Sequence, residues 1–229
     1  MNTSICIFCG KETKGAQLEV AGSIINLSAA EVCSDPVCIR KNDEEYRRTQ
    51  IREAMPKLIG EVPEAIRETD LALLPSDKAK QIAESWIPNS KGKSLFICGG
   101  VRSGKTRSAF MATKRIAIAK MTPIVWVDSY RLEEAFTGYG AGNADLAKIR
   151  SARLVFMDDL GKEKMTDKVA SGIFKILDHR TAHGMTTIVT SNFTPTALAD
   201  RFNDETLGGA IRGRLIDFFD RYLLEKPKD

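Results

Sequence analysis

The chain has 229 residues, of which 43% are hydrophobic and 28% are charged, with a formal net charge of +4. This composition is ordinary for a globular protein with a buried core, and the length fits one domain with a small appendage. No stretch approaches the roughly 18 apolar residues of a membrane span. The N-terminus also lacks a secretion signal pattern, so we expect a cytoplasmic protein without a membrane partner. The modest positive charge permits nucleic-acid binding but does not require it.

Four of the five cysteines form two close pairs near the N-terminus, Cys6 with Cys9 and Cys33 with Cys38. In a reducing compartment such pairs point to a metal site, although two disulfides or unrelated thiols stay open as alternatives. Four thiolates can close a tetrahedral Zn²⁺ site, and such a site has no open position for catalysis. We therefore expect residues 1–45 to form a zinc-binding module that the metal stabilises and that serves as an interaction surface.

Three segments around the cysteines have clear local patterns. Residues 17–20 and 24–27 flank a small-residue turn and predict a β-hairpin. After the second cysteine pair, residues 40–53 carry charges of both signs at helical spacing, which predicts a solvated helix that ends before Pro56. Further on, residues 77–86 predict a helix with Ser76 as its N-cap.

The central motif is a glycine-rich loop that matches the phosphate-loop pattern G-x-x-x-x-G-K-[ST]. The apolar run 94–98 before it predicts a buried strand, and residues 107–120 after it predict a helix. Backbone N–H groups of such a loop face the phosphates of ATP. Lys105 would reach the β- and γ-phosphates, and Thr106 would offer its hydroxyl to Mg²⁺. A plain glycine turn would not explain this lysine and threonine. The predicted cofactor-binding residues are Gly99, Gly100, Val101, Arg102, Ser103, Gly104, Lys105 and Thr106.

A second apolar strand, 154–157, ends in two acids, Asp158 and Asp159. Behind a phosphate loop, this pattern is typical of a Walker B motif, although any buried strand can end in acids at a surface loop. We expect Asp158 to hold Mg²⁺ directly or through water, and Asp159 to polarise the attacking water.

Further along the chain, two features extend this interpretation. The strand 186–191 ends at Asn192, which would orient the water as a sensor 1 residue, or would simply be a turn residue. Arg212 and Arg214 are arginines that could neutralise transition-state charge on a neighbouring subunit, with a solvated basic surface as the alternative. His179 and His183 have the i, i+4 spacing of helical metal ligands, but no third ligand is evident. We expect them to be surface or interface residues.

From about residue 59 to 215 the chain resembles the helicase-loader ATPases of the AAA+ class, the DnaC/DnaI-like group with the IstB transposition helper close by. The residues that carry the resemblance are 99–106, 154–161, 187–192 and 212–215. It implies a three-layer α/β/α P-loop fold with a parallel sheet. Residues 91–229 would form an ATPase core without a full helical lid, and residues 46–90 a helical linker and the N-terminal part of the ATPase.

The resemblance also implies further roles, with Arg214 as the arginine finger that acts on a neighbouring subunit. Residues 59–67 would fold over the adenine base, and the loop 162–166 would lie where relatives touch single-stranded DNA. Phe136 and Tyr139 could stack on bases, with packing as the alternative. Arg221 is the one late candidate for a second sensor.

Two positions depart from the family pattern. Arg102 stands where AAA+ loops usually have glycine, and would be strained if that position needs a positive φ. Asp159 stands where glutamate is usual, and its reach is shorter.

Three functions are consistent with these patterns. The first is an ATP-dependent loader of a hexameric, DnaB-like replicative helicase, which oligomerises on ATP and binds single-stranded DNA, with hydrolysis driving release. The second is an IstB-like helper ATPase of transposition or recombination. The third is a zinc-dependent adaptor in which the nucleotide is a switch with little turnover. The first two predict an ATPase with ATP, Mg²⁺ and Zn²⁺ as cofactors.

Overall fold

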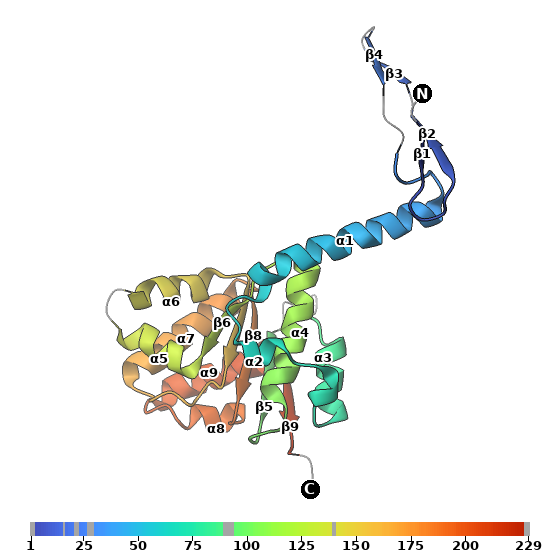
Figure 1. The fold of residues 1–229 in the computed structure, drawn as a ribbon. Coiled ribbons are helices and arrows are strands. Elements are labelled where there is room, and N and C mark those ends of the chain that lie inside the picture. Colours follow the sequence, from blue (N-terminus) through green and yellow to red (C-terminus); the bar gives the residue numbers. More distant parts are fainter. Residues whose placement is uncertain are drawn as a thin grey trace. The chain divides into compact units, whose positions relative to one another are not determined.

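The computed structural model describes residues 3–15, 17–20, 23–26, 30–88, 94–138 and 141–226. The chain divides into two compact units, Met1–Ala54 and Met55–Asp229. Figure 1 shows the elements of both units in chain order. No helix in these described ranges is both long and apolar enough to cross a membrane.

The first unit consists of two small hairpins and the start of a long helix. Strands β1 (Thr3–Ile5) and β2 (Glu12–Lys14) pair antiparallel, and so do β3 (Gln17–Val20) and β4 (Ser23–Asn26), which confirms the predicted hairpin. Helix α1 (Pro36–Ile59) begins at the second cysteine pair.

Helix α1 is longer than predicted, because it continues through Pro56. A proline inside a helix removes one hydrogen bond to the preceding turn and crowds the carbonyl four residues earlier. The helix ends at Ile59, within one turn of this proline. The proline therefore marks the end of the helix, but it does not stop the helix at its own position.

The second unit is built on a five-stranded parallel sheet in the order β6-β7-β8-β5-β9. Most of its strand residues are buried, as expected when both faces of a sheet are covered, whereas the edge strand Phe219–Leu224 includes charged and exposed residues. This confirms the predicted three-layer α/β/α fold with a parallel sheet. The strands are β5 (Ser94–Gly99), β6 (Val125–Asp128), β7 (Leu154–Asp158), β8 (Thr186–Ser191) and β9 (Phe219–Leu224).

Helices cover both faces of this sheet (Figure 1). Side chains such as Phe96 and Val155 belong to the main core cluster, together with residues of α5, α6, α7 and α9. On the other side, α4 contacts three of the strands, and α3 packs on α4. The helices of this unit are α2 (Glu64–Arg67), α3 (Asp77–Ser85), α4 (Lys105–Lys120), α5 (Ser129–Thr137), α6 (Ala141–Ser151), α7 (Asp167–Ala182), α8 (Pro195–Ala199) and α9 (Glu205–Asp217), with one 3₁₀ turn, η1 (Leu71–Leu73).

The predicted cap of α3 is present, since the Ser76 hydroxyl accepts the N–H of Ala79 at 3.2 Å. The predicted loop over 138–143 is shorter than expected, because α6 already begins at Ala141. Tyr139 lies outside the described residues.

A buried arginine joins the base of the sheet to its helices. Arg180 of α7 has no exposed surface, and burial lowers the pKa of its guanidinium to about 10. It donates to the hydroxyl of Thr187 and to the carbonyls of Ile149, Ala152 and Thr186, at 2.7–2.8 Å. A buried charge of this kind is tolerated only when its donors are satisfied, so Arg180 is a structural anchor.

Candidate functional site

The phosphate loop joins the end of β5 to the start of α4, and two of its glycines are required by close approach. Gly99 has φ of 147°, and a Cβ there would lie 1.9 Å from the carbonyl oxygen of Leu224. Gly104 has φ of 85°, and a Cβ there would lie 2.6 Å from Cδ of Pro75. Any larger residue at either position would therefore force the loop away from its neighbours.

Arg102 adopts the left-handed conformation, with φ of 64°. The backbone strain expected at this position is therefore present, because a non-glycine residue is strained in the left-handed region. The arginine side chain is exposed, so the strain is confined to the backbone of the loop.

The loop has the donors that bind phosphate. Helix α4 has no side-chain cap at Gly104, so its first N–H groups are open to an anion. The hydroxyl of Ser103 is buried without a hydrogen-bond partner. Lys105 is buried, which lowers the pKa of its ammonium, and its Nζ donates to the Gly100 carbonyl at 2.7 Å. These residues fit the phosphates of a nucleotide.

A cavity of about 360 Å³ adjoins the loop, between residues 102–107 and the side chains of Leu73 and Pro75. Pro63 and Ile66, from the segment 59–67 that was expected to fold over the adenine base, line a second cavity together with Asp158 and Asp159.

The predicted magnesium ligands lie together at the carboxyl edge of the sheet. The hydroxyl of Thr106 donates to Oδ1 of Asp158 at 2.8 Å, and the hydroxyl of Thr190 donates to the same oxygen at 2.5 Å. Burial raises the pKa of the Asp158 carboxyl, and these two hydrogen bonds oppose that shift. A hydroxyl and a carboxylate at this separation are suitable oxygen ligands for Mg²⁺.

Asp159 lies beside this group in a left-handed conformation, with φ of 58°. Its N–H donates to the Thr190 hydroxyl at 2.9 Å, and its carboxylate is paired with Lys162 at 2.6 Å. The sequence assigned no role to Thr190. The signal was available, since parallel neighbouring strands bring residues at their carboxyl ends together.

Within the described residues, no hydrogen bond links the two remaining predicted catalytic residues to this group. Asn192 follows β8 and is half-buried. Arg214 lies on α9, where Nε and a terminal nitrogen donate to Oδ1 of Asp178 on α7 at 2.9 and 2.5 Å. An arginine held in this way would have to leave Asp178 before it could reach a neighbouring subunit. Arg221 lies on β9 with an exposed side chain.

A larger cavity, of about 960 Å³, opens beside the two aspartates. Lys162, Lys164 and the exposed Tyr130 line it. Phe136 does not take part, because its ring is buried against Gly172, where a Cβ would lie 2.1 Å away. Of the two interpretations of this phenylalanine, packing is therefore confirmed.

Glu163 is the second residue that sequence reasoning did not single out for a role of its own. It is 2% exposed, and Oε2 accepts the N–H of Gly161 at 2.6 Å, whereas Oε1 is buried without a hydrogen-bond partner. Burial raises the pKa of this carboxyl to about 7. Glu163 stabilises the turn that follows Asp158 and Asp159, and no sequence pattern distinguishes it from the exposed charges beside it.

The sequence of residues 40–221 matches the family described as IstB-like ATP binding protein. The chain belongs to this family. With the phosphate loop and the two aspartates in place, it is an ATPase of the AAA+ class. No curated protein matches the chain.

Solved structures with the same fold include proteins of bacterial replication. DnaI is 21% identical, with a TM-score of 0.53 over 76% of this chain and 93% of its own. The DnaC helicase loader is 20% identical, with a TM-score of 0.58 over 71% of this chain and 99% of its own. A putative primosome component from Streptococcus pyogenes serotype M3 is 16% identical, with a TM-score of 0.56 over 73% of this chain and 92% of its own. At these identities the likeness establishes the fold of this IstB-like protein.

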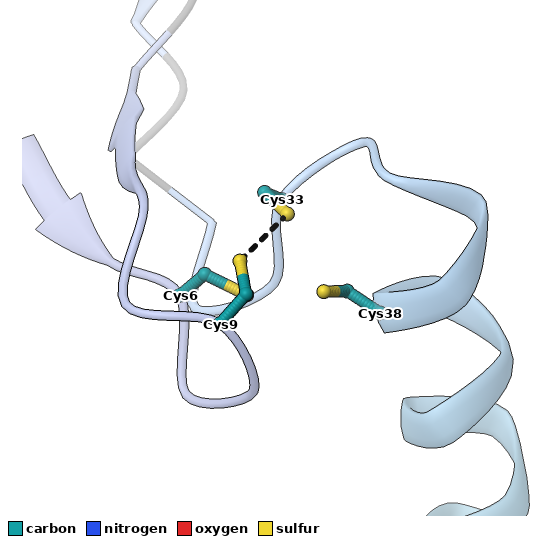
Figure 2. A group of neighbouring side chains, drawn as sticks. All are labelled: Cys6, Cys9, Cys33 and Cys38. Carbon is teal, nitrogen blue, oxygen red and sulfur yellow. Dashed lines mark hydrogen bonds between the residues drawn. The ribbon is translucent and has the colours of Figure 1, made fainter.

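All four paired cysteines of this IstB-like protein precede the segment that matches the family. Figure 2 shows that their sulfur atoms converge, with Cys6 and Cys9 on the loop after β1, Cys33 on the segment before α1, and Cys38 in the first turn of α1. The four Sγ atoms lie within 4.8 Å of one another, and those of Cys9 and Cys33 are 3.6 Å apart. A tetrahedral Zn²⁺ site with bonds of about 2.3 Å needs sulfurs about 3.8 Å apart. The thiols therefore fit such a site.

The surroundings of these thiols differ. Backbone N–H groups, first that of Cys33, lower the pKa of the Cys6 thiol to about 6, against the effect of burial. Burial and the neighbouring thiols raise the pKa of Cys38 to about 12. Four thiolates this close repel one another, and a divalent cation would compensate that charge.

The two histidines form no such cluster. Their rings stack at 4.1 Å, and Nδ1 of His183 lies 2.7 Å from the carbonyl of His179. Arg150 approaches Nδ1 of His179 at 3.3 Å, which does not suit a cation-binding site. Within the described ranges, the one group of three or more potential metal ligands is the cysteine cluster.

Proposed function

We propose that this IstB-like protein is an ATP-dependent loader of a hexameric, DnaB-like replicative helicase. ATP binding would assemble subunits on single-stranded DNA, and hydrolysis would release the helicase. The observation that carries the proposal is the cluster of Thr106, Asp158 and Asp159 beside an uncapped phosphate loop. The cysteine module ahead of the ATPase supports a role in docking to another protein.

The residues of the site have distinct proposed roles. Lys105 binds the β- and γ-phosphates, while Thr106 and Asp158 hold Mg²⁺, which would neutralise charge on the phosphates. Asp159 accepts a proton from the attacking water or orients it, and Asn192 orients the same water. Asp159 is paired with Lys162, so it must be released from that lysine before it can act as a base.

We propose Zn²⁺ as the metal of the cysteine module. Closing the site would order the loop after β1 against the start of α1. The side chains of Ile5, Ile7, Val37 and Ile39 are exposed near the four cysteines in sequence. Exposed apolar side chains of this kind are typical of a docking surface, so this module is the proposed contact for the helicase.

Single-stranded DNA would bind along the loop 162–166, as the resemblance to the loaders implies. Lys162 and Lys164 supply cations for phosphates, and the exposed ring of Tyr130 supplies a surface on which a base can stack. Arg214 would complete the ATP site of the neighbouring subunit in the assembled oligomer.

The test is a pull-down of a purified hexameric replicative helicase by the full chain, with and without ATP. We expect the wild-type chain to capture the helicase and the Cys33→Ser variant to lose this capture. The Lys105→Ala variant should still capture the helicase, but the amount captured should no longer depend on ATP. Removing a buried, charged phosphate donor weakens binding by about 3 kcal/mol, or roughly 100-fold, so Lys105→Ala separates nucleotide from docking. No capture by the wild-type chain in either condition would contradict the proposal.

The family description itself favours a second candidate, an IstB-like helper of transposition or recombination. Such a helper would act on duplex DNA, so its ATP turnover would rise with duplex rather than with single-stranded DNA. A third candidate, an adaptor with little turnover, is favoured by the strained Arg102 and by the pairing of Asp159 with Lys162. Measured turnover below about 0.01 per minute with either DNA, far under typical enzyme rates, would favour the adaptor.

A further inference from the structure

One buried hydroxyl connects the two aspartates of the ATP site. Thr190 has no exposed surface. Its Oγ1 donates to Oδ1 of Asp158 at 2.5 Å and accepts the N–H of Asp159 at 2.9 Å. A threonine hydroxyl has one proton to donate and lone pairs to accept, so both functions are used here.

We infer that Thr190 is a positioning residue for ATP hydrolysis, whose hydroxyl orients the Asp158 carboxylate and holds the backbone N–H of Asp159. The inference rests on the ATPase activity of the proposed function. It adds a residue from β8 to a site whose other parts come from the phosphate loop and β7.

The end of β8 also holds the backbone of the turn. The carbonyl of Thr190 accepts the N–H of Leu160 at 2.8 Å, and the hydroxyl of Ser191 donates to the Leu160 carbonyl at 2.6 Å. These bonds do not use the Thr190 hydroxyl. A variant that lacks only this hydroxyl should therefore keep both of them and lose only its contacts with the Asp158 carboxylate and the Asp159 N–H.

The hydroxyl becomes more important once Mg²⁺ binds. Asp158 Oδ1 has two hydroxyl donors, Thr106 and Thr190. Because Thr106 is the proposed Mg²⁺ ligand, its hydroxyl would turn to the metal, and Thr190 would then remain as the donor that orients Asp158. Groups that orient a metal ligand in this way typically change metal affinity or activity about 10- to 100-fold when removed.

Strand β8 offers a matched control. Thr187 is 1% exposed and lies on the same strand, but its hydroxyl accepts a hydrogen bond from Nε of Arg180, away from the aspartates. Thr187→Val therefore makes the same change in a buried threonine at the start of β8, where the hydroxyl contacts Arg180 and not the aspartates.

The experiment compares the wild-type full chain with Thr190→Val, Thr190→Ser and Thr187→Val. Steady-state ATP turnover is measured against Mg²⁺ concentration, and binding of a fluorescent ATP analogue is titrated with and without Mg²⁺. For Thr190→Val we expect kcat to fall about 10- to 100-fold and half-saturating Mg²⁺ to rise, with little change in Mg²⁺-free binding. Thr190→Ser should restore most of the turnover and of the Mg²⁺ affinity, and Thr187→Val should lower Tm while keeping the Mg²⁺ dependence.

Two results would overturn the inference: wild-type Mg²⁺ dependence in Thr190→Val, or equal effects of Thr190→Val and Thr187→Val. A wild-type chain that binds Mg²⁺ and nucleotide without turnover would contradict the proposed hydrolysis. The Mg²⁺ titration of analogue binding would still decide the role of Thr190.

Discussion

The two units of this protein are stabilised in different ways. Among the described side chains of the first unit, the cysteines Cys6 and Cys38 are buried, while Ile5, Ile7 and Val37 are exposed. The second unit buries apolar side chains on both faces of its sheet, and Leu95 and Phe219 are two examples. A unit with little buried apolar surface needs a cross-link or a metal, whereas the larger unit can fold by burial alone.

Metal removal should give the largest effect and should act on one unit alone. Structural zinc contributes about 10 kcal/mol or more to the folding of such modules, so a chelator should unfold residues 3–38 and leave the sheet intact. Hydrogen exchange read by mass spectrometry measures this segment by segment, and metal analysis should give one zinc per chain. Cys98→Ser, in the buried strand β5, should keep the metal. If the amides of residues 3–38 stayed protected from exchange in the presence of chelator, the first unit would not need a metal to fold.

Within the second unit, Arg214→Ala should stop turnover that depends on the oligomer while leaving ATP binding by the monomer unchanged. Arginine fingers contribute about 1,000-fold or more to phosphoryl transfer. Arg212→Ala, an exposed arginine on the same helix, is the matched control. Asp178→Asn, which loosens the pairing within the subunit, should not slow turnover. Wild-type rates from Arg214→Ala would show that the arginine has only its structural role.

Asp159→Ala should keep ATP binding and slow hydrolysis by about 100-fold or more, because general-base groups contribute at least that much. Binding is measured with a fluorescent ATP analogue, and hydrolysis by phosphate release. Asp167→Ala, an exposed acid at the start of α7, should change neither. Hydrolysis at the wild-type rate by Asp159→Ala would show that another group activates the attacking water.

Glu163→Gln should change how the stability of the second unit depends on pH. Since burial raises the pKa of Glu163 to about 7, the folded state holds its proton more tightly than the unfolded chain does. The contribution of Glu163 to the free energy of unfolding is therefore largest below the ordinary pKa of a glutamate, and it is lost as pH rises through about 7.

Relative to wild type, the Glu163→Gln variant should therefore gain stability between pH 5 and pH 8, by about 3 kcal/mol at most. Urea unfolding at both pH values measures the difference. An equal difference at the two pH values would show that Glu163 is ionised throughout.

The smallest effect is expected at the phosphate loop. Arg102→Gly should stabilise the second unit by about 1 kcal/mol, because glycine adopts the left-handed conformation without strain. Tm should then rise by about 2–4 °C, as measured by differential scanning calorimetry. Arg107→Gly, within helix α4, should change Tm in the opposite direction. A lower Tm for Arg102→Gly would show that the arginine side chain contributes more than its backbone strain removes.

Much of the fold followed from local patterns whose physical cause is also local. The Ser76 cap, the pairing of β3 with β4, and the strand before the phosphate loop each depend on a few neighbouring residues. The parallel sheet followed from the resemblance, and its five strands confirm it. Sequence alone did not predict that α1 would continue through Pro56, because packing decides whether a helix tolerates a proline.

The candidate site was predictable where a motif carries its own chemistry, as for Lys105 and Asp158. Thr190 and Glu163 could not be assigned in this way, because their roles depend on which strands become neighbours and on how deeply a carboxyl is buried. The same holds for Arg214, whose contact with Asp178 joins two helices far apart in the sequence. The roles of the site residues and of Arg214 in a neighbouring subunit stay predictions.

The phosphate loop also has a consequence for how the chain folds. Strand β5, which carries the loop, pairs with β8 and β9, both far downstream, and the loop's first glycine lies against the backbone of Leu224. Parallel pairings over such long separations form slowly, since the intervening chain must be closed before they are gained. The nucleotide pocket is therefore expected to be among the last parts to form, and ATP, which binds only the completed loop, would shift the balance toward the fully folded chain.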